Sequence, residues 1–185
     1  MRIHKWLWRR WSILAVALLL CAATLCGDKE DVELRVKAAY LLNFARFIEW
    51  PRSSSGGLEP VVIGILGHDS LSRALENTVQ GKNIKGHPIK VKELGSLERV
   101  EGCDILFVPR SEAKRARALL PDLSGRPILT VGEGSGFLGQ GGMIEFQLID
   151  DALRFSINLG SADRSGLTIS SELLRVAYSV TGKRK

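Results

Sequence analysis

The stretch VVIGIL at residues 61–66 decides the fold class, because none of its six residues carries a charge or a polar side chain. A continuous apolar run of this length is typical of a strand buried on both faces, as in a parallel sheet. The segment from Ser70 to Val79 follows, with apolar residues at helical spacing. The pattern therefore predicts a buried strand and a helix that crosses back over the sheet.

Two later runs, ILFV at residues 105–108 and ILTV at residues 128–131, repeat the buried-strand pattern. Residues 111–120 lie between them with helical spacing, and Ser111 is a suitable N-cap. The run IKVKEL at residues 89–94 alternates instead, and its two lysines favour an edge strand. This alternation of strands and helices predicts an α/β fold with a central, mostly parallel sheet flanked by helices.

The pattern changes at residues 143–159, where two alternating runs flank Asp150 and Asp151. Two strands joined by a two-residue turn predict an antiparallel hairpin that extends the sheet on its C-terminal side. Symmetric pairing about the turn places the large apolar residues on one face, as Leu148 with Leu153, Phe146 with Phe155, and Ile144 with Ile157. The other face is predicted to meet water or a partner, and it carries Glu145, Gln147, Arg154, Ser156 and Asn158.

Amphipathic helices are predicted on both sides of this region. The first lies in LRVKAAYLLNFARFIEWP at residues 34–51 and is expected to end at Trp50, because Pro51 disfavours helical geometry in the residue before it. The second is predicted over Ser170–Val180, with serine as its cap. Three aromatic residues of the first helix are expected to pack against the sheet: Phe44, Phe47 and Trp50.

Residues 1–27 are predicted to be a cleaved signal peptide. Basic residues at positions 2, 5, 9 and 10 precede an uncharged apolar run at residues 12–25, and the first acidic residue is Asp28. A basic start, a short apolar run and small residues near its end are typical of secretory signals. A membrane span needs about 20 apolar residues, which is more than this run supplies. An uncleaved N-terminal anchor is the alternative.

Removal of this segment changes the charge balance. Residues 1–27 hold four of the 26 basic residues and none of the 20 acidic ones, so the net charge falls from +6 to +2. The charge of the remaining residues does not favour nucleic-acid binding, because their basic run is the short GKRK at the C-terminus. Residues 28–185 are enough for a single domain with one hydrophobic core.

The sequence offers no recognisable catalytic or metal-binding motif. His68 and His87 stand far apart without a nearby cysteine pair, and G-x-S-x-G does not occur. The run His68–Asp69–Ser70 has the residue types of a triad, but adjacent side chains point apart. His68 is either a plain loop residue or a ligand contact after the first strand. Cys103 is expected to be buried and inert, and we predict no enzymatic activity, cofactor or metal.

The glycine-rich segment GEGSGFLGQGG at residues 132–142 contains the spacing G-x-G-x-x-G. A nucleotide phosphate site needs a helix directly behind such glycines, whereas a strand is predicted here. We therefore interpret the segment as a loop. Its two large apolar residues, Phe137 and Leu138, either pack beneath the loop or are exposed for a partner.

Seven blocks of this sequence, in order, resemble the YfiR family, also called YfiR/HmsC-like. They are KAAYLLNFARFIEWP, VIGILG, GCDILFV, ILTVGE, GGMIEF, RFSINL and LTISSELLRVA. No single block is diagnostic, but in order they span residues 37–177, which is nearly the whole length of residues 28–185. The resemblance assigns a structural role within these blocks to Phe44, Phe47, Trp50, Pro51, Gly67, Cys103 and Gly142.

The resemblance implies a periplasmic α/β protein without enzymatic activity. Proteins similar to YfiR bind the periplasmic sensor region of a membrane diguanylate cyclase and repress it, which lowers cyclic-di-GMP and the output of biofilm and exopolysaccharide. They can be homodimeric. Many carry a disulfide, from which this chain departs because a signal peptide ending at residue 27 leaves Cys103 as its single cysteine.

Two functions remain open from the sequence. A repressor that docks on a membrane cyclase would use the hairpin residues Glu145, Arg154 and Asn158, or the loop tip Phe137–Leu138. A small-ligand sensor that feeds a transporter or a two-component system would instead use the loops after the parallel strands. Those loops lie near Gly67–Asp69, Pro109–Ser111 and Gly132–Gly136.

Overall fold

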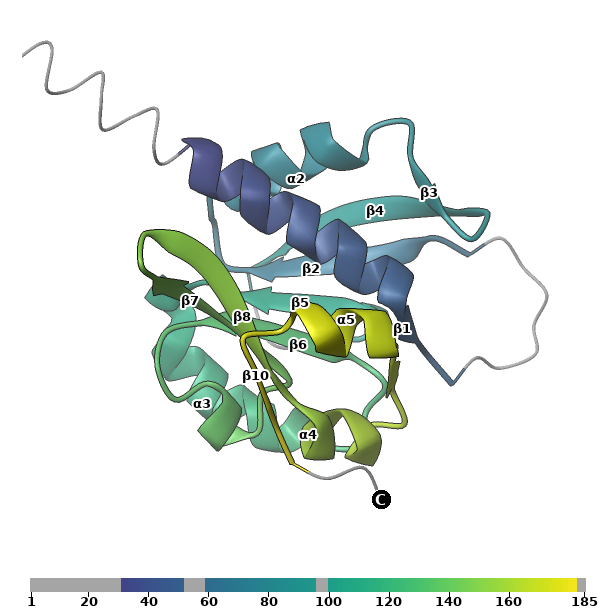
Figure 1. Cartoon of the computed structure of the whole chain (residues 1–185). Helices are drawn as coiled ribbons and strands as arrows, with labels where there is room; N and C mark the ends of the chain where they lie inside the picture. Colours follow the sequence, from purple (N-terminus) through teal and green to yellow (C-terminus); the bar gives the residue numbers. More distant parts are fainter. Residues whose placement is uncertain (1–30, 52–58, 96–99, 183–185) are drawn as a thin grey trace, which may run out of the picture.

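The computed structural model describes residues 31–51, 59–95 and 100–182 (Figure 1). The predicted signal peptide, residues 1–27, lies outside the described residues, so its cleavage stays a prediction. Within the described part of the chain, no helix combines the length and apolar character needed to cross a membrane.

A sheet of eight strands forms the centre of the described residues (Figure 1). The central strands β4, β2, β5, β6 and β7 run parallel to their neighbours, and β10 runs parallel to β8. The antiparallel pairs are β7 with β8 and β3 with β4. The predicted mostly parallel sheet with an antiparallel hairpin is confirmed. The spatial order is β10 (Ser179–Thr181), β8 (Ala152–Asn158), β7 (Ile144–Ile149), β6 (Leu129–Glu133), β5 (Ile105–Val108), β2 (Val61–Leu66), β4 (His87–Leu94) and β3 (Asn83–Ile84).

Helices cover both faces of this sheet. The N-terminal helix, residues 31–47, crosses one face, and α2 (Leu71–Val79) and α5 (Ser171–Val176) pack on the same side (Figure 1). The opposite face is covered by α3 (Ala113–Leu123). The remaining short elements are η2 (Arg110–Glu112), η3 (Leu138–Gln140), α4 (Leu159–Arg164) and a two-stranded antiparallel pair of β1 (Ile48–Glu49) with β9 (Thr168–Ile169).

An aromatic cluster joins the N-terminal helix to the hairpin. Phe44 is fully buried, with its ring centroid 5.8 Å from that of Phe146 and 5.1 Å from that of Phe155. Tyr40 adds a further ring 5.3 Å from Phe155. Rings at these separations gain attraction beyond the apolar area they bury. The predicted packing of the helix is therefore confirmed at Phe44, while Phe47 and Trp50 pack against the same core with partial exposure.

The predicted end of the N-terminal helix was wrong by three residues. The helix ends at Phe47, and Ile48 and Glu49 pair with Ile169 and Thr168 as strand β1. Backbone pairing with a distant segment replaces helical hydrogen bonds here, so Pro51 lies beyond the helix end.

The hairpin register is confirmed at every predicted pair: Leu148 with Leu153, Phe146 with Phe155, and Ile144 with Ile157. Asp150 and Asp151 form the turn with φ of 50° and 57°. Two left-handed residues give the turn whose twist matches the paired strands, and aspartate tolerates this conformation better than most residues.

Two predicted helices differ from the structure in their bounds. The helix expected from Ser111 is preceded by a 3-10 turn, begins at Ala113 and runs to Leu123. The helix expected over Ser170–Val180 is capped by Ser170 as predicted, but it ends at Val176. The Tyr178 amide then donates to the Phe155 carbonyl oxygen at 2.8 Å, and strand β10 follows. Pairing with β8 therefore decides the conformation of this segment.

Strand β4 confirms the predicted edge over most of its length. The two-residue strand β3 pairs only with His87 and Pro88 at the start of β4. Among the described residues, no strand pairs with the outer side of Ile89–Leu94. Lys90 and Lys92 thus stand on an open edge, as the alternation predicted.

Candidate functional site

The glycine-rich loop wraps around a buried aromatic ring. Phe137 is 4% exposed, and its ring occupies the space where side chains at Gly132 and Gly142 would lie. Any residue other than glycine at these two positions would collide with the ring. The two glycines therefore allow the loop to pack closely around the ring. Phe137 was expected either to pack beneath the loop or to be exposed for a partner, and the structure shows that it packs beneath the loop. The structural role expected for Gly142 has its physical basis in this contact.

Leu138 is held by side chains of the hairpin. Its amide donates to Glu145 Oε2 at 3.0 Å, and its carbonyl oxygen accepts from Asn158 Nδ2 at 3.2 Å. Gln147 Nε2 donates to the other Glu145 oxygen at 2.7 Å. The structure thus brings together four of the five predicted partner-binding residues as one loop–hairpin cluster: Phe137, Leu138, Glu145 and Asn158.

The polar hairpin face was expected to meet water or a partner, and this is wrong at Glu145 and Ser156, which are each 2% exposed and covered by this chain itself. The loop covers Glu145, whose carboxylate satisfies the Leu138 amide, and Ser156 pairs with Ser179 of β10. Polar side chains are buried here because each has a hydrogen-bond partner. The alternation of residues along a strand does not show that a distant segment, such as the glycine-rich loop or β10, will cover one of its faces.

Arg154 lies apart from this cluster and is exposed. It stands opposite Gln147 in the hairpin register, whereas Glu145 stands opposite Ser156. Of the five predicted residues, Arg154 therefore offers the most open side chain, while Leu138 and Asn158 are half-buried.

A charged network lies at the carboxyl ends of the parallel strands. Lys37 Nζ of the N-terminal helix is 2.5 Å from Glu133 Oε1 and 2.6 Å from Glu33 Oε1, and the Arg110 amide donates to the second Glu133 oxygen at 3.2 Å. Burial disfavours the charged amine, but the hydrogen bonds to Glu133 and Glu33 outweigh this effect and raise the pKa of Lys37. Lys37 is therefore fixed as a cation at the end of β6.

A groove of about 240 Å³ opens beside this network. Arg110, Glu133, Ser135 and Gln140 supply its polar lining, and Phe137 supplies part of its apolar wall. This groove includes parts of the loops that a ligand sensor was predicted to use, near Pro109–Ser111 and Gly132–Gly136.

The third predicted loop, Gly67–Asp69, has its own contacts. Gly67 adopts φ of 76°, and the Glu112 side chain fills the space beside its Cα. His68 Nδ1 lies 2.7 Å from Glu93 Oε2, while Asp69 Oδ1 accepts the Leu71 amide at 2.8 Å. His68 and Asp69 therefore interact with different partners, Glu93 and the Leu71 amide.

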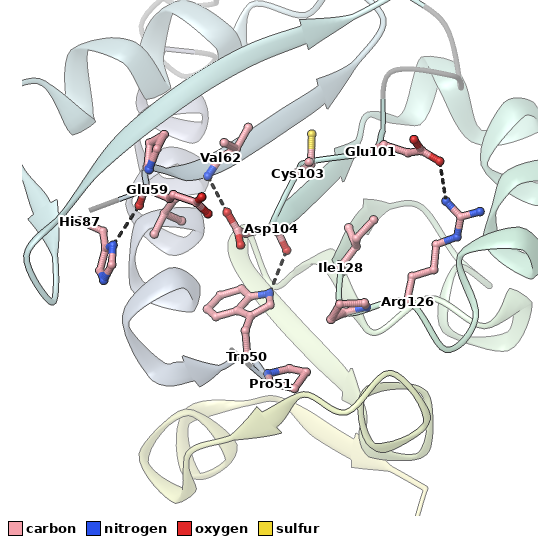
Figure 2. Close-up of a pocket in the computed structure, with 14 residues that line it drawn as sticks. Trp50, Pro51, Glu59, Val62, His87, Glu101, Cys103, Asp104, Arg126 and Ile128 are labelled. Carbon is pink, nitrogen blue, oxygen red and sulfur yellow. Dashed lines mark hydrogen bonds and ion pairs between the residues drawn. The ribbon is translucent and has the colours of Figure 1, made fainter. Parts of the chain in front are cut away.

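Sequence reasoning missed a larger pocket, of about 570 Å³, at the amino ends of β2, β5 and β6. Figure 2 shows the Trp50 indole near its centre, with Glu59 and His87 on one side and Glu101 and Arg126 on the other. Trp50 Nε1 donates to the Asp104 carbonyl oxygen at 3.2 Å, and Asp104 Oδ2 accepts the Val62 amide at 2.8 Å (Figure 2). The pocket depends on segments far apart in the sequence, so no local motif marks it.

Cys103 forms part of the wall of this pocket and is buried, as predicted. Desolvation raises the pKa of its thiol and outweighs the opposing charge of Lys92, and Asp104 adds a smaller effect in the same direction as desolvation. A thiol that stays protonated is a poor nucleophile, which accords with the structural role expected for this residue.

The largest exposed apolar side chains were also missed. Val176, Tyr178 and Val180 are 67%, 59% and 41% exposed around strand β10, and Leu148 is exposed near the hairpin turn. The sequence pattern predicted that Val176, Tyr178 and Val180 belong to an amphipathic helix over Ser170–Val180, so it did not predict an exposed apolar strand edge here.

Among the described residues, no group of three His, Cys, Asp or Glu side chains is placed to hold a metal ion. The described residues form an open α/β domain whose candidate binding surfaces lie on loops, in two pockets and at a sheet edge. The chain belongs to the YfiR/HmsC-like family, whose sequence profile matches residues 34–178.

One solved structure supports the fold. A conserved domain protein from Vibrio cholerae superposes with a TM-score of 0.53 at 14% identity, over 65% of this chain and 54% of that chain. The ABC domain from Streptococcus pneumoniae, solved in complex with L-Trp, gives a TM-score of 0.47 at 14% identity over 65% of this chain and 55% of that one, too low a score to carry an argument. The chain therefore spans about half the length of these structures. No curated protein matches it significantly.

Proposed function

We propose that this chain is a periplasmic regulator that binds the periplasmic sensor region of a membrane diguanylate cyclase and represses it. The observation that carries the proposal is the match to the YfiR/HmsC-like family over residues 34–178. Repression lowers cyclic-di-GMP, and with it biofilm and exopolysaccharide output. The function requires export, so residues 1–27 act as a cleaved signal peptide in this proposal.

Preformed surface features favour binding as the mechanism. The loop–hairpin cluster fixes Leu138 through two hydrogen bonds to side chains, and Arg154 presents an exposed charge on the same hairpin. A rigid surface loses little conformational entropy when a partner docks. In this proposal Leu138, Arg154 and Asn158 face the partner, while Phe137 and Glu145 support them from beneath.

The test is a gene deletion in the native bacterium, followed by measurement of cyclic-di-GMP. Deletion should raise cyclic-di-GMP, and the wild-type gene should lower it again. Arg154→Glu should complement less well than Arg154→Lys, because charge reversal opposes docking whereas lysine keeps the charge. Unchanged cyclic-di-GMP after deletion under several growth conditions would defeat the proposal. Equal complementation by both variants would remove Arg154 from the surface and leave the function standing.

A small-ligand sensor is the second candidate, and the groove beside Glu133 favours it. Arg110, Glu133, Ser135 and Gln140 supply both donors and acceptors around about 240 Å³, a volume suited to a small polar molecule. If deletion leaves cyclic-di-GMP unchanged, this candidate moves ahead. Its direct test is a screen of small polar metabolites for a rise in the melting temperature of the purified chain, which Arg110→Ala should abolish.

A further inference from the structure

Strand β10 ends the sheet with an open edge. Among the described residues, its one strand neighbour is β8, with Ser179 beside Ser156 and Thr181 beside Asn158. The Tyr178 amide points toward β8, where it donates to the Phe155 carbonyl oxygen. The Asn158 amide donates to the Met143 carbonyl oxygen just before β7, so the backbone groups of Ser156 and Asn158 face β7, and those of Phe155 and Ile157 face β10. In the register of β10 with β8, Ser179 and Thr181 therefore pair with β8, and the N–H and C=O of Val180 between them point away from it. This edge can therefore accept another strand.

The side chains at this edge are apolar where an edge strand is usually charged. Tyr178 is 59% exposed and Val180 41%, and alternation places both on the face of the sheet that carries Phe155 and Ile157. Recognition by strand addition combines backbone hydrogen bonds with contacts to every second side chain. The edge offers both, since Val180 presents outward backbone groups and the side chains of Tyr178 and Val180 are exposed.

The charge around β10 indicates what kind of strand would bind. From Arg164 to the C-terminus the sequence has one acidic residue, Glu172, against five basic residues: Arg164, Arg175, Lys183, Arg184 and Lys185. Arg154 on the adjacent strand β8 is also basic and exposed. A second copy of the chain would bring two such basic segments together, which opposes a homodimer at this edge. An acidic segment is the complementary partner.

We propose that β10 is the docking edge for an extended, acidic segment of the cyclase's periplasmic region, which adds to the sheet as a strand beside β10. This inference rests on the proposed function and names the surface and the chemistry through which it acts.

The first experiment places a photo-crosslinking phenylalanine at position 178 of the full chain in living cells. Lys90, exposed on β4 at the opposite side of the sheet, is the matched control position. We expect position 178, and not position 90, to give a product that contains the cyclase. A product that joins two copies of this chain, a different protein at position 178, or equal crosslinking from position 90 would overturn the inference.

The second experiment separates the backbone from the side chain at Val180. Val180→Pro removes the outward N–H, whereas Val180→Thr keeps it and keeps a side chain of similar shape. Loss of the N–H should weaken the complex by about tenfold, so the proline variant should fail to restore low cyclic-di-GMP while the threonine variant restores it. Equal envelope levels and melting temperatures would show that both variants fold.

If the proline variant does not fold, Tyr178→Ser supplies the same test through the side chain. Full complementation by Tyr178→Ser and by any folded Val180→Pro would overturn the edge while the proposed function stands. Unchanged cyclic-di-GMP after gene deletion would instead defeat the proposed function and the inference with it.

Discussion

The two edges of the central sheet meet solvent in opposite ways. Strand β4 presents Pro88, Lys90 and Glu93 as exposed residues, and proline and charge both discourage the addition of another strand. Strand β10 presents exposed Val180, with exposed Tyr178 directly before it, and within the described part of the chain no strand pairs with its outer side. The difference teaches that openness alone does not define a docking edge, because the outer side of β4 is open over most of its length.

Burial beneath the two edges is similar. Ile157 and Phe155 lie under the β10 side, and Leu94 lies at the end of β4, all of them buried. Both edges thus rest on a packed core, and only their outward faces differ. The predictions below use this contrast between core and edge.

The largest expected effect contrasts two aromatic residues on the β10 side. Phe155→Ala should lower the free energy of unfolding by about 3–5 kcal/mol, because its buried ring packs against Tyr40 and Phe44. Tyr178→Ala should change it by less than about 0.5 kcal/mol, because the side chain is largely exposed. Urea unfolding of the three proteins measures both. If both variants lost the same free energy of unfolding, Tyr178 would be part of the core, and the contrast between buried Phe155 and exposed Tyr178 would fail.

A smaller effect is expected when the β4 edge loses its charges. The double change Lys90→Val and Lys92→Val should leave the free energy of unfolding within about 0.5 kcal/mol of wild type. It should promote self-association, since an apolar open edge can pair with another chain. Sedimentation velocity over a concentration series measures this change.

The matched control for that variant is Lys114→Leu with Arg117→Leu on α3, where both residues are exposed. It removes the same charge and adds apolar surface away from any strand edge. Self-association of the control to the same degree would assign the effect to net charge, and the lysines would no longer explain the β4 edge.

The smallest effect concerns Cys103, which lies beneath the β4 side. A side chain at Gly64 would approach both Cys103 Sγ and Leu94 Cδ1, so the thiol packs in the space that this glycine leaves. Burial raises the pKa of the thiol, which means that the folded state holds this proton more tightly than the unfolded chain. The resulting stability is present below the unfolded pKa of the thiol and is lost as the pH rises through the folded value.

The free energy of unfolding of wild type should therefore fall in alkaline solution relative to that of Cys103→Ala. The measurement is urea unfolding of both proteins from neutral to alkaline pH. Thiol labelling of the native protein should also be slow at neutral pH, and fast labelling would show that the β4 side opens readily. A constant difference between the two proteins across this range would contradict the burial argument.

The sequence by itself determined the parts of this protein that depend on local pattern. Continuous apolar runs identified β2, β5 and β6 because both faces of a central strand are buried. The hairpin register followed from alternation about Asp150 and Asp151, since a slip by one residue would expose the apolar set. The family also followed from the order of its sequence blocks.

Only the tertiary structure decided the environment of the candidate surface residues. Glu145 is buried because the glycine-rich loop covers it, and Phe137 is buried because Gly132 and Gly142 leave space for its ring. The residues of β10 fitted a helix pattern, but hydrogen bonds to β8 made them a strand. Such contacts join segments far apart in the chain, and a local pattern carries no information about which segment will supply the cover or the pairing partner.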